Sequence, residues 1–211
     1  INGNTWEDST GILRQLKLIG LVAYRKLINQ GVSTFHDITE LSEDQIEYYL
    51  GLKIGLGNKI KEDVYLLPSL KLRMKPDKYV ETTNSKVGVT FKVEISAIFK
   101  SIMWHGKYLS IDCETVDQNG NLLDFRRVSL NQLKSPKSFR IETIVESTDF
   151  KLSFLLNCQE IAGIGQIIEF TFSDIDNQYK RLIKTSPKHK TLDQCLFTPE
   201  KPNDDHLLSD D

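Results

Sequence analysis

The sequence predicts an α+β chain made of two parts, a small all-helical unit followed by an all-β sandwich of about seven strands. The spacing of apolar residues is helical up to residue 68 and then changes to the two-residue period of strands. Turn signals then separate short apolar strands, which is the pattern of an immunoglobulin-like or fibronectin-III-like sandwich. We therefore expect a flexible N-terminus over 1–9, a helical unit over 10–68, the sandwich over 69–175 and a mostly flexible tail over 176–211.

Apolar stripes and capping signals support the helical unit. Ser42 to Gln45 has the form of a capping box, in which Ser and Gln side chains satisfy the free N–H groups of a helix start. A later helix is expected from Gly57 to Pro68. The apolar residues with helical spacing before these are Ile12, Leu13, Leu16 and Ile19 in one stripe and Ala23, Leu27 and Ile28 in the next.

Alternating residues support the sandwich. From Val87 to Ile98 every second residue is apolar, so this strand has one buried and one wet face. Asp117 to Gly120 contains an Asn-Gly step, which favours a hairpin turn. A first strand begins at Leu70, and further strands are expected at 107–116, 122–130, 138–146, 149–157 and 165–174.

The predicted tail contains an apolar group in a polar context. We interpret it as a strap that docks on the sandwich, or else as a short partner-binding motif, because apolar side chains are usually buried. Its residues are Leu192, Cys195, Leu196 and Phe197.

The signals of a catalytic, metal or nucleotide site are missing, so we expect no enzyme activity, no metal and no cofactor in this chain. The four histidines are isolated, and the three cysteines are scattered. The glycines from Gly51 to Ile60 do not have the spacing of a phosphate-binding loop. No apolar stretch reaches the roughly 20 residues that span a bilayer. A net charge of −2 gives no overall attraction to nucleic acid, so DNA binding would need a local patch.

The segment from Leu16 to Val32 resembles a helix-hairpin-helix. In that motif the N–H groups at the hairpin hold a DNA phosphate, and nearby cations hold its neighbours. Gly20 matches the second hairpin glycine, whereas Leu18 stands in place of the first. The candidate DNA-binding residues are Lys17, Gly20, Arg25 and Lys26, and the competing interpretation is a hairpin that only packs helices.

Together with the segment from Gly57 to Leu72, this hairpin resembles the Sec-sixty-three type accessory region of superfamily-two helicases, and most of all the meiotic crossover helicases of the Mer-three or HFM-one family. The resemblance implies a parent protein with a 3′-to-5′ DNA helicase motor that binds ATP and Mg²⁺ and acts in the nucleus on meiotic chromosomes. It also implies that the immunoglobulin-like domain docks partners, including the MutL-type mismatch-repair heterodimer.

We predict that the docking surface includes Arg126 and Arg127, because arginine is enriched at the centres of protein interfaces. The competing interpretation is an ordinary wet sheet face. Lys71, Arg73 and Lys75 form a second basic row, for which protection of a sheet edge is the simpler interpretation. Tyr48 with Tyr49 and Trp104 with His105 are candidates for stacking on single-stranded DNA.

Two functions follow as hypotheses. The favoured one is a non-catalytic docking module that recruits recombination or mismatch-repair proteins while the helical unit braces it against the helicase motor. The alternative is a DNA-binding accessory that grips phosphates of branched or single-stranded DNA through the helical hairpin. A secreted adhesion domain is disfavoured, because an antibody-type cysteine pair and glycosylation sequons are missing.

Overall fold

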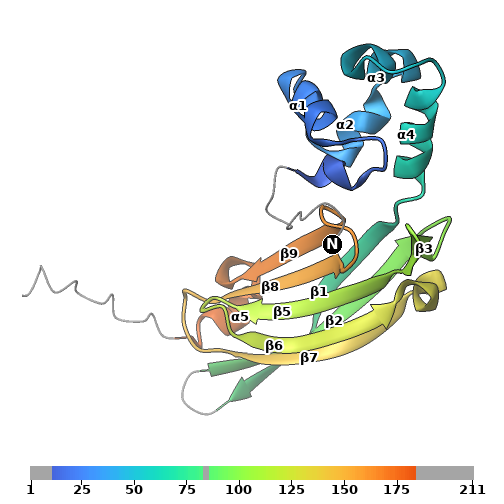
Figure 1. Ribbon diagram of the computed structural model, residues 1–211. Coiled ribbons are helices and arrows are strands. Elements are labelled where there is room, and N and C mark those ends of the chain that lie inside the picture. The colour runs from blue at the N-terminus through green and yellow to red at the C-terminus, as the bar shows by residue number, and fades with distance from the viewer. Residues whose placement is uncertain (1–10, 83–85, 184–211) are drawn as a thin grey trace, which may run out of the picture.

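The computed structural model describes residues 11–82 and 86–183 of the chain (Figure 1). Helices come first in the chain and antiparallel sheets follow, so the predicted α+β class with a β-sandwich is confirmed at this level. The expected flexible N-terminus and the apolar group from Leu192 to Phe197 lie outside the described residues. The helical part consists of a 3₁₀ helix η1 (Ile12–Gln15) and the α-helices α1 (Leu21–Asn29), α2 (Phe35–Glu40), α3 (Glu43–Leu50) and α4 (Leu56–Tyr65).

Side-chain caps begin two of these helices. The predicted capping box of α3 is present: the Gln45 N–H donates to the Ser42 hydroxyl at 3.1 Å, and the Ser42 N–H donates to the Gln45 side chain at 2.8 Å. Thr34 and Asp37 form a second capping box on α2. Gly51 ends α3 with a φ of 68°, a left-handed conformation that glycine adopts without strain.

The prediction of a regular helix before the hairpin was wrong, because the segment is mostly not helical. The segment forms only the 3₁₀ helix η1, after which Leu16 takes an extended backbone. Tight turns continue the segment, since the Leu16 N–H donates to the Leu13 carbonyl and the Ile19 N–H to the Leu16 carbonyl. The tighter path places Leu13, Gln15 and Leu16 in the interior together, which an α-helical stripe would not do.

Seven longer strands form two antiparallel sheets, in agreement with the seven predicted. One sheet has the order β1-β2-β7 and the other the order β6-β5-β8-β9, while β3 and β4 form a separate short hairpin that was not predicted. The strands are β1 (Ser69–Thr82), β2 (Lys86–Ile98), β3 (Met103–Trp104), β4 (Lys107–Tyr108), β5 (Ser110–Asp117), β6 (Leu122–Ser129), β7 (Lys137–Val145), β8 (Lys151–Cys158) and β9 (Gly165–Thr171).

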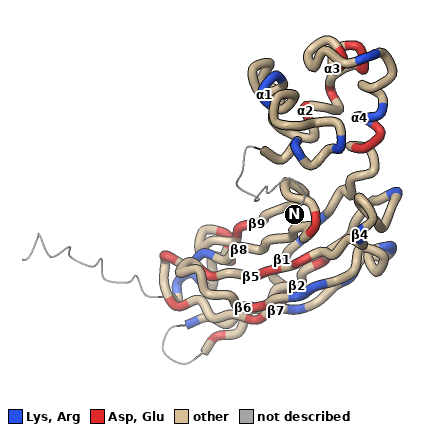
Figure 2. Tube along the Cα trace, in the orientation of Figure 1, with Lys and Arg blue, Asp and Glu red and all other residues tan. Residues whose placement is uncertain are grey.

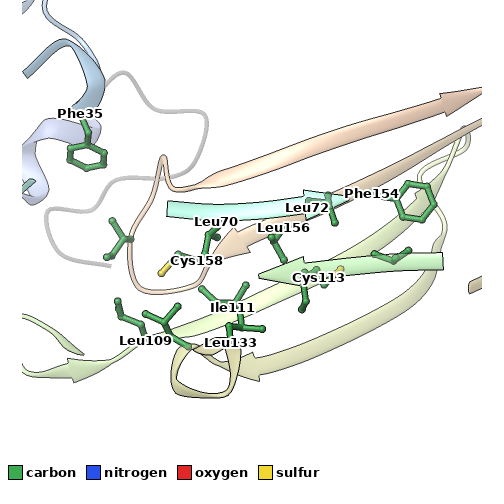
Figure 3. Packing of buried hydrophobic residues seen from close by; sticks show 14 of the residues in the cluster. Phe35, Leu70, Leu72, Leu109, Ile111, Cys113, Leu133, Phe154, Leu156 and Cys158 are labelled. Atoms are coloured by element: carbon green, nitrogen blue, oxygen red, sulfur yellow. The ribbon is translucent and has the colours of Figure 1, made fainter. Parts of the chain in front are cut away.

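The two sheets bury their alternating residues against each other. Phe91 of β2 packs edge-on against Phe154 of β8 and Phe170 of β9, with ring centroids 5.4 and 4.8 Å apart. Figure 3 shows the same interior closer to the helices, where side chains from β1, β5 and β8 point toward one another. Burial of each such side chain contributes about 1.5–3 kcal/mol, so this interior is the main source of stability.

A buried glutamine joins the helical part to the sandwich. The Gln15 side chain is 2% exposed, and its amide donates to the Ala162 carbonyl while its oxygen accepts from the Ala162 N–H, both at 3.0 Å. Beside it, Ile12 lies against Gly163. The helical part and the β8–β9 loop are therefore held together by specific polar and apolar contacts.

The chain stays folded beyond the predicted end of the sandwich at residue 175. A short helix α5 (Asn177–Lys180) follows the 3₁₀ helix η3 (Phe172–Asp174), and a further 3₁₀ helix η2 (Leu130–Lys134) links β6 to β7. Tyr179 stacks on Tyr79 of β1 with ring centroids 4.7 Å apart, and Ile183 is buried. The part of the expected flexible tail over 176–183 is thus packed on the sandwich.

Candidate partner-binding surface

The two predicted docking arginines lie on β6, an edge strand of the four-stranded sheet. Within the described residues, β6 pairs only with β5 on one side. Arg126 and Arg127 are exposed, as expected, with 44% and 49% of their side chains accessible. Their role in partner binding stays a prediction.

Arg127 is held on the outer face of the sheet by its cross-strand neighbour. It donates two hydrogen bonds to the Asp112 carboxylate, at 2.6 and 2.7 Å. The hydrogen bond to Asp112 raises the pKa of Arg127 above its ordinary value, so the guanidinium stays charged at any physiological pH. This two-point contact fixes the direction in which the guanidinium projects.

Arg126 points the other way and covers the gap between the two sheets. It donates two hydrogen bonds to Asp124, at 2.8 and 3.2 Å, and its guanidinium lies 4.3 Å from the centre of the Phe139 ring on β7. A cation over an aromatic face is stabilised by the ring quadrupole. Both arginines are therefore partly neutralised and partly immobilised.

A row of three apolar residues and one glutamate runs across the outer face of this sheet beside Arg127. Register places Phe125, Glu114, Leu155 and Ile167 opposite one another on β6, β5, β8 and β9. Phe125 is 46% exposed and Ile167 58% exposed, and the Arg127 guanidinium lies 5.5 Å from the Phe125 ring centre. An exposed aromatic next to an ordered arginine has the composition of an interface centre.

The four hairpin residues are not brought together as one cationic site. Gly20 is the exposed N-cap of α1, and Lys17 and Arg25 are exposed near it. Lys26 has a different role, since its ammonium donates to the Leu50 carbonyl at 2.9 Å and so satisfies the end of α3.

The tip of the hairpin is apolar. Leu18, Leu21 and Val22 are 39%, 46% and 69% exposed around the start of α1. A phosphate at this helix start would therefore meet apolar side chains beside the free N–H groups.

The aromatic candidates for base stacking differ from each other in exposure. Tyr48 is 84% exposed on α3, with its ring near that of Tyr49. Trp104 is only 3% exposed and stacks on His105, so its predicted role on single-stranded DNA was wrong. Burial and the nearby Lys17 lower the pKa of His105, which keeps this ring neutral at pH 7.

The described residues contain neither a candidate metal-binding cluster nor a reactive cysteine. They contain no group of three or more histidine, cysteine or acidic side chains placed to hold a metal ion. Burial raises the pKa values of the Cys113 and Cys158 thiols to about 12, so neither is a reactive nucleophile at neutral pH. No helix within 11–82 and 86–183 is long and apolar enough to cross a membrane.

Sequence reasoning missed the residues that hold the arginines. Asp112, Asp124 and Phe139 were not singled out, and neither was Phe125 beside them. The local signal for Asp124 was its place two residues before Arg126. The pairing of Asp112 with Arg127 depends on register between strands and carries no local signal.

Comparisons with known proteins identify relatives of this chain. No family model matches it. The ATP-dependent DNA helicase MER3 of Saccharomyces cerevisiae is 45% identical over 198 residues, which cover 93% of this chain and 17% of the helicase. The ATP-dependent DNA helicase homolog MER3 of Arabidopsis thaliana is 29% identical over 138 residues, 64% of this chain and 12% of that protein. The probable ATP-dependent DNA helicase HFM1 of Homo sapiens is 29% identical over 85 residues, 40% of this chain and 6% of that protein.

The chain therefore spans between 6% and 17% of the length of these three relatives. The match to the yeast protein nonetheless extends over almost all of the chain, from the helical part into the sandwich. We conclude that this chain is homologous to a segment of the MER3/HFM1 DNA helicases.

Proposed function

We propose that this chain is a non-catalytic docking module of a MER3/HFM1 helicase, and that its sandwich, of immunoglobulin-like type, recruits a MutL-type mismatch-repair heterodimer or another recombination protein. The observation that carries the proposal is the edge strand β6, which presents two ordered arginines beside the exposed Phe125. An edge strand accessible along its length suits recognition by another protein, because its second side has backbone groups free to pair.

Preorganisation is the physical advantage of this surface. A free arginine loses about 2 kcal/mol of side-chain entropy when it is immobilised, and the carboxylates of Asp112 and Asp124 reduce that loss before a partner arrives. A carboxylate on the partner would accept hydrogen bonds from the N–H donors of each guanidinium that the aspartates leave unused. The exposed apolar side chains of this face, Phe125 and Ile167, would supply the part of the interface that excludes water.

The helical part suits a brace between this module and the helicase motor of the parent. It exposes large apolar side chains on three elements, including Val22 of α1 at 69% and Ile54 before α4 at 96%. Such residues are typical of a face that a further domain covers. In this proposal the motor binds ATP and Mg²⁺ and unwinds DNA in the 3′-to-5′ direction, and the whole protein acts in the nucleus during meiotic recombination.

A capture experiment tests the docking function. The chain is immobilised and exposed to purified MutL-type heterodimer, and Arg126→Glu with Arg127→Glu is compared with Lys107→Glu and Lys134→Glu. The control pair reverses the same number of charges at exposed positions outside β6. We expect the β6 variant alone to lose capture while both variants remain folded at the assay temperature, as thermal unfolding would show. Equal capture by both variants would refute docking through β6.

The alternative function, DNA binding by a helix-hairpin-helix, has one observation in its favour. The N-cap residue Gly20 has no side chain to satisfy the first N–H groups of α1, and Lys17 and Arg25 are exposed nearby. Charge reversal at Lys17 and Arg25 should then abolish salt-sensitive binding to branched or single-stranded DNA. Binding that survives this reversal would rule out the hairpin as the contact.

A further inference from the structure

The outer face of the three-stranded sheet carries a row of like charges. Register places Lys75 of β1 opposite Lys92 of β2, and Lys92 opposite Arg140 of β7, so three cations cross the sheet side by side. Adjacent strands lie about 4.8 Å apart, and like charges directly opposite each other are destabilising. The chain maintains this arrangement on an exposed face although its net charge is −2.

Further cations extend the row into a patch, which we name the basic face. On β1, side chains on the same face recur about every 6.8 Å, which places Lys71, Arg73 and Lys75 in line. Lys78 returns to this face after a bulge at Asp77. The basic face consists of Lys71, Arg73, Lys75, Lys78, Lys92 and Arg140. Figure 2 marks the Lys and Arg positions along the chain in blue.

Most of this charge is not neutralised within the described residues. Arg73 lies 3.6 Å from Glu94, and Arg140 lies 3.3 Å from Asp77. The four lysines of the basic face form no ion pair with any residue in 11–82 or 86–183. They remain available to an anionic partner.

Protection of a sheet edge does not account for the whole pattern. Lysines on an edge strand discourage pairing with other chains, and this suffices for β1 and β7, which are both edges. Lys92, however, lies on the central strand β2. It lines two hollows of the surface, one of about 570 Å³ shared with Arg73 and Lys75, and one of about 300 Å³ shared with Arg140.

We propose that the basic face is a phosphate-binding surface that holds the backbone of DNA. The side chains between its cations include the hydroxyls of Thr90, Ser96 and Ser138, which can donate hydrogen bonds to phosphate oxygens, and the carboxylates of Glu94 and Glu142. The exposed apolar side chains of this face, Val80 and Ile144, lie beyond Lys78 at one end, so the cations do not surround the apolar centre that is typical of a protein interface. Lysine contacts of this kind bind DNA regardless of sequence. The choice of DNA among polyanions rests on the proposed function of the parent, whereas the site itself is separate from β6 and from the helical hairpin.

Fluorescence anisotropy with labelled duplex and forked DNA, between about 50 and 200 mM salt, tests this surface. The variant Lys75→Gln with Lys92→Gln is compared with Lys107→Gln with Lys134→Gln, which removes the same charge elsewhere on the chain. We expect the first pair to weaken binding at least tenfold and to reduce the slope of log affinity against log salt by about 2. The control pair should leave the slope and the affinity as they are.

A second pair on the same face, Lys71→Gln with Lys78→Gln, shows whether the effect belongs to the basic face rather than to one substitution. It should also weaken DNA binding and reduce the slope of log affinity against log salt. The proposal is overturned if the unaltered chain binds DNA without salt dependence, or if all pairs give the same slope. Binding to a polyglutamate peptide with none to DNA would also overturn it and make the face a protein site. Capture of the MutL-type heterodimer, measured on the same samples, should be unaffected, so the two proposals fail independently.

Discussion

Replacement of Gln15 by Ala tests how firmly the helical part is fixed to the sandwich. The substitution removes one donor and one acceptor from a buried site and leaves both the N–H and the carbonyl of Ala162 without their partner. Ala162 is itself 4% exposed, so bulk water has little access to these groups.

An unsatisfied buried polar group costs about 1–3 kcal/mol. Two such groups would together cost about 2–6 kcal/mol. Because water can partly enter the space left by the side chain, we expect Gln15→Ala to lower the free energy of unfolding by about 3 kcal/mol. For a chain of this size each 1 kcal/mol corresponds to about 2–4 °C, which gives a decrease in Tm of about 6–12 °C.

Urea and thermal unfolding of the full chain provide the measurement. Gln15→Leu fills most of the same space without hydrogen bonds, so it should lose nearly as much stability as Gln15→Ala. Gln178→Ala on the exposed face of α5 is the control and should change stability by no more than about 0.5 kcal/mol. A loss for Gln15→Ala as small as that of the control would show that the link to Ala162 does not hold the two parts together.

Three further predictions concern the interior and the helical part. Burial raises the thiol pKa values of Cys113 and Cys158 from 9.0 to about 12. The stability that the two neutral thiols contribute is therefore complete below pH 9 and is lost as pH rises toward 12. A variant with Ala at both sites that loses the same free energy of unfolding over this pH range, measured by chemical unfolding, would contradict this. Gly57→Ala should destabilise by about 1–3 kcal/mol despite the better helix propensity of alanine, because its Cβ would clash with the backbone carbonyl oxygen of Glu43 in α3. Gly20→Ala, which has open space, is the control, and equal melting temperatures would be evidence against the close packing. Lys26→Met should lower the free energy of unfolding by about 1 kcal/mol, because the hydrogen bond to the end of α3 is lost, and it should leave DNA binding unchanged. Weaker DNA binding of this variant in fluorescence anisotropy would show that Lys26 contacts DNA after all.

The strands could be predicted from the sequence because their two-residue period is a local property. Along β2 the apolar residues from Val87 to Ile95 alternate, and the same residues alternate in burial. Register could not be predicted in the same way. A shift between Thr115 and Val116 changes the pairing of β5 with β6 by one residue, and such a shift decides which side chains share a face. The Arg127–Asp112 pair depends on that shift.

Long-range contacts explain the errors. The stripe from Ile12 to Ile19 fits both an α-helix and tighter turns, since periods of 3.6 and 3.0 differ little over two turns. The hydrogen bonds of Gln15 with Ala162 join residues 147 positions apart, and no local pattern reports such a contact. Trp104 was misassigned because its two-residue strand is too short to give a periodic signal. The row through Lys92 likewise required the register of three strands at once.

The most direct test of docking through β6 is a charge exchange across the Arg127–Asp112 pair. Arg127→Asp with Asp112→Arg keeps an ion pair between β5 and β6 but moves the guanidinium off the edge strand. Titration calorimetry of this variant and of the unaltered chain with purified MutL-type heterodimer gives the two affinities, while thermal unfolding confirms equal stability. Docking through β6 predicts at least a tenfold weaker affinity, about 1.4 kcal/mol, in the exchanged variant. Affinity equal to that of the unaltered chain would contradict it.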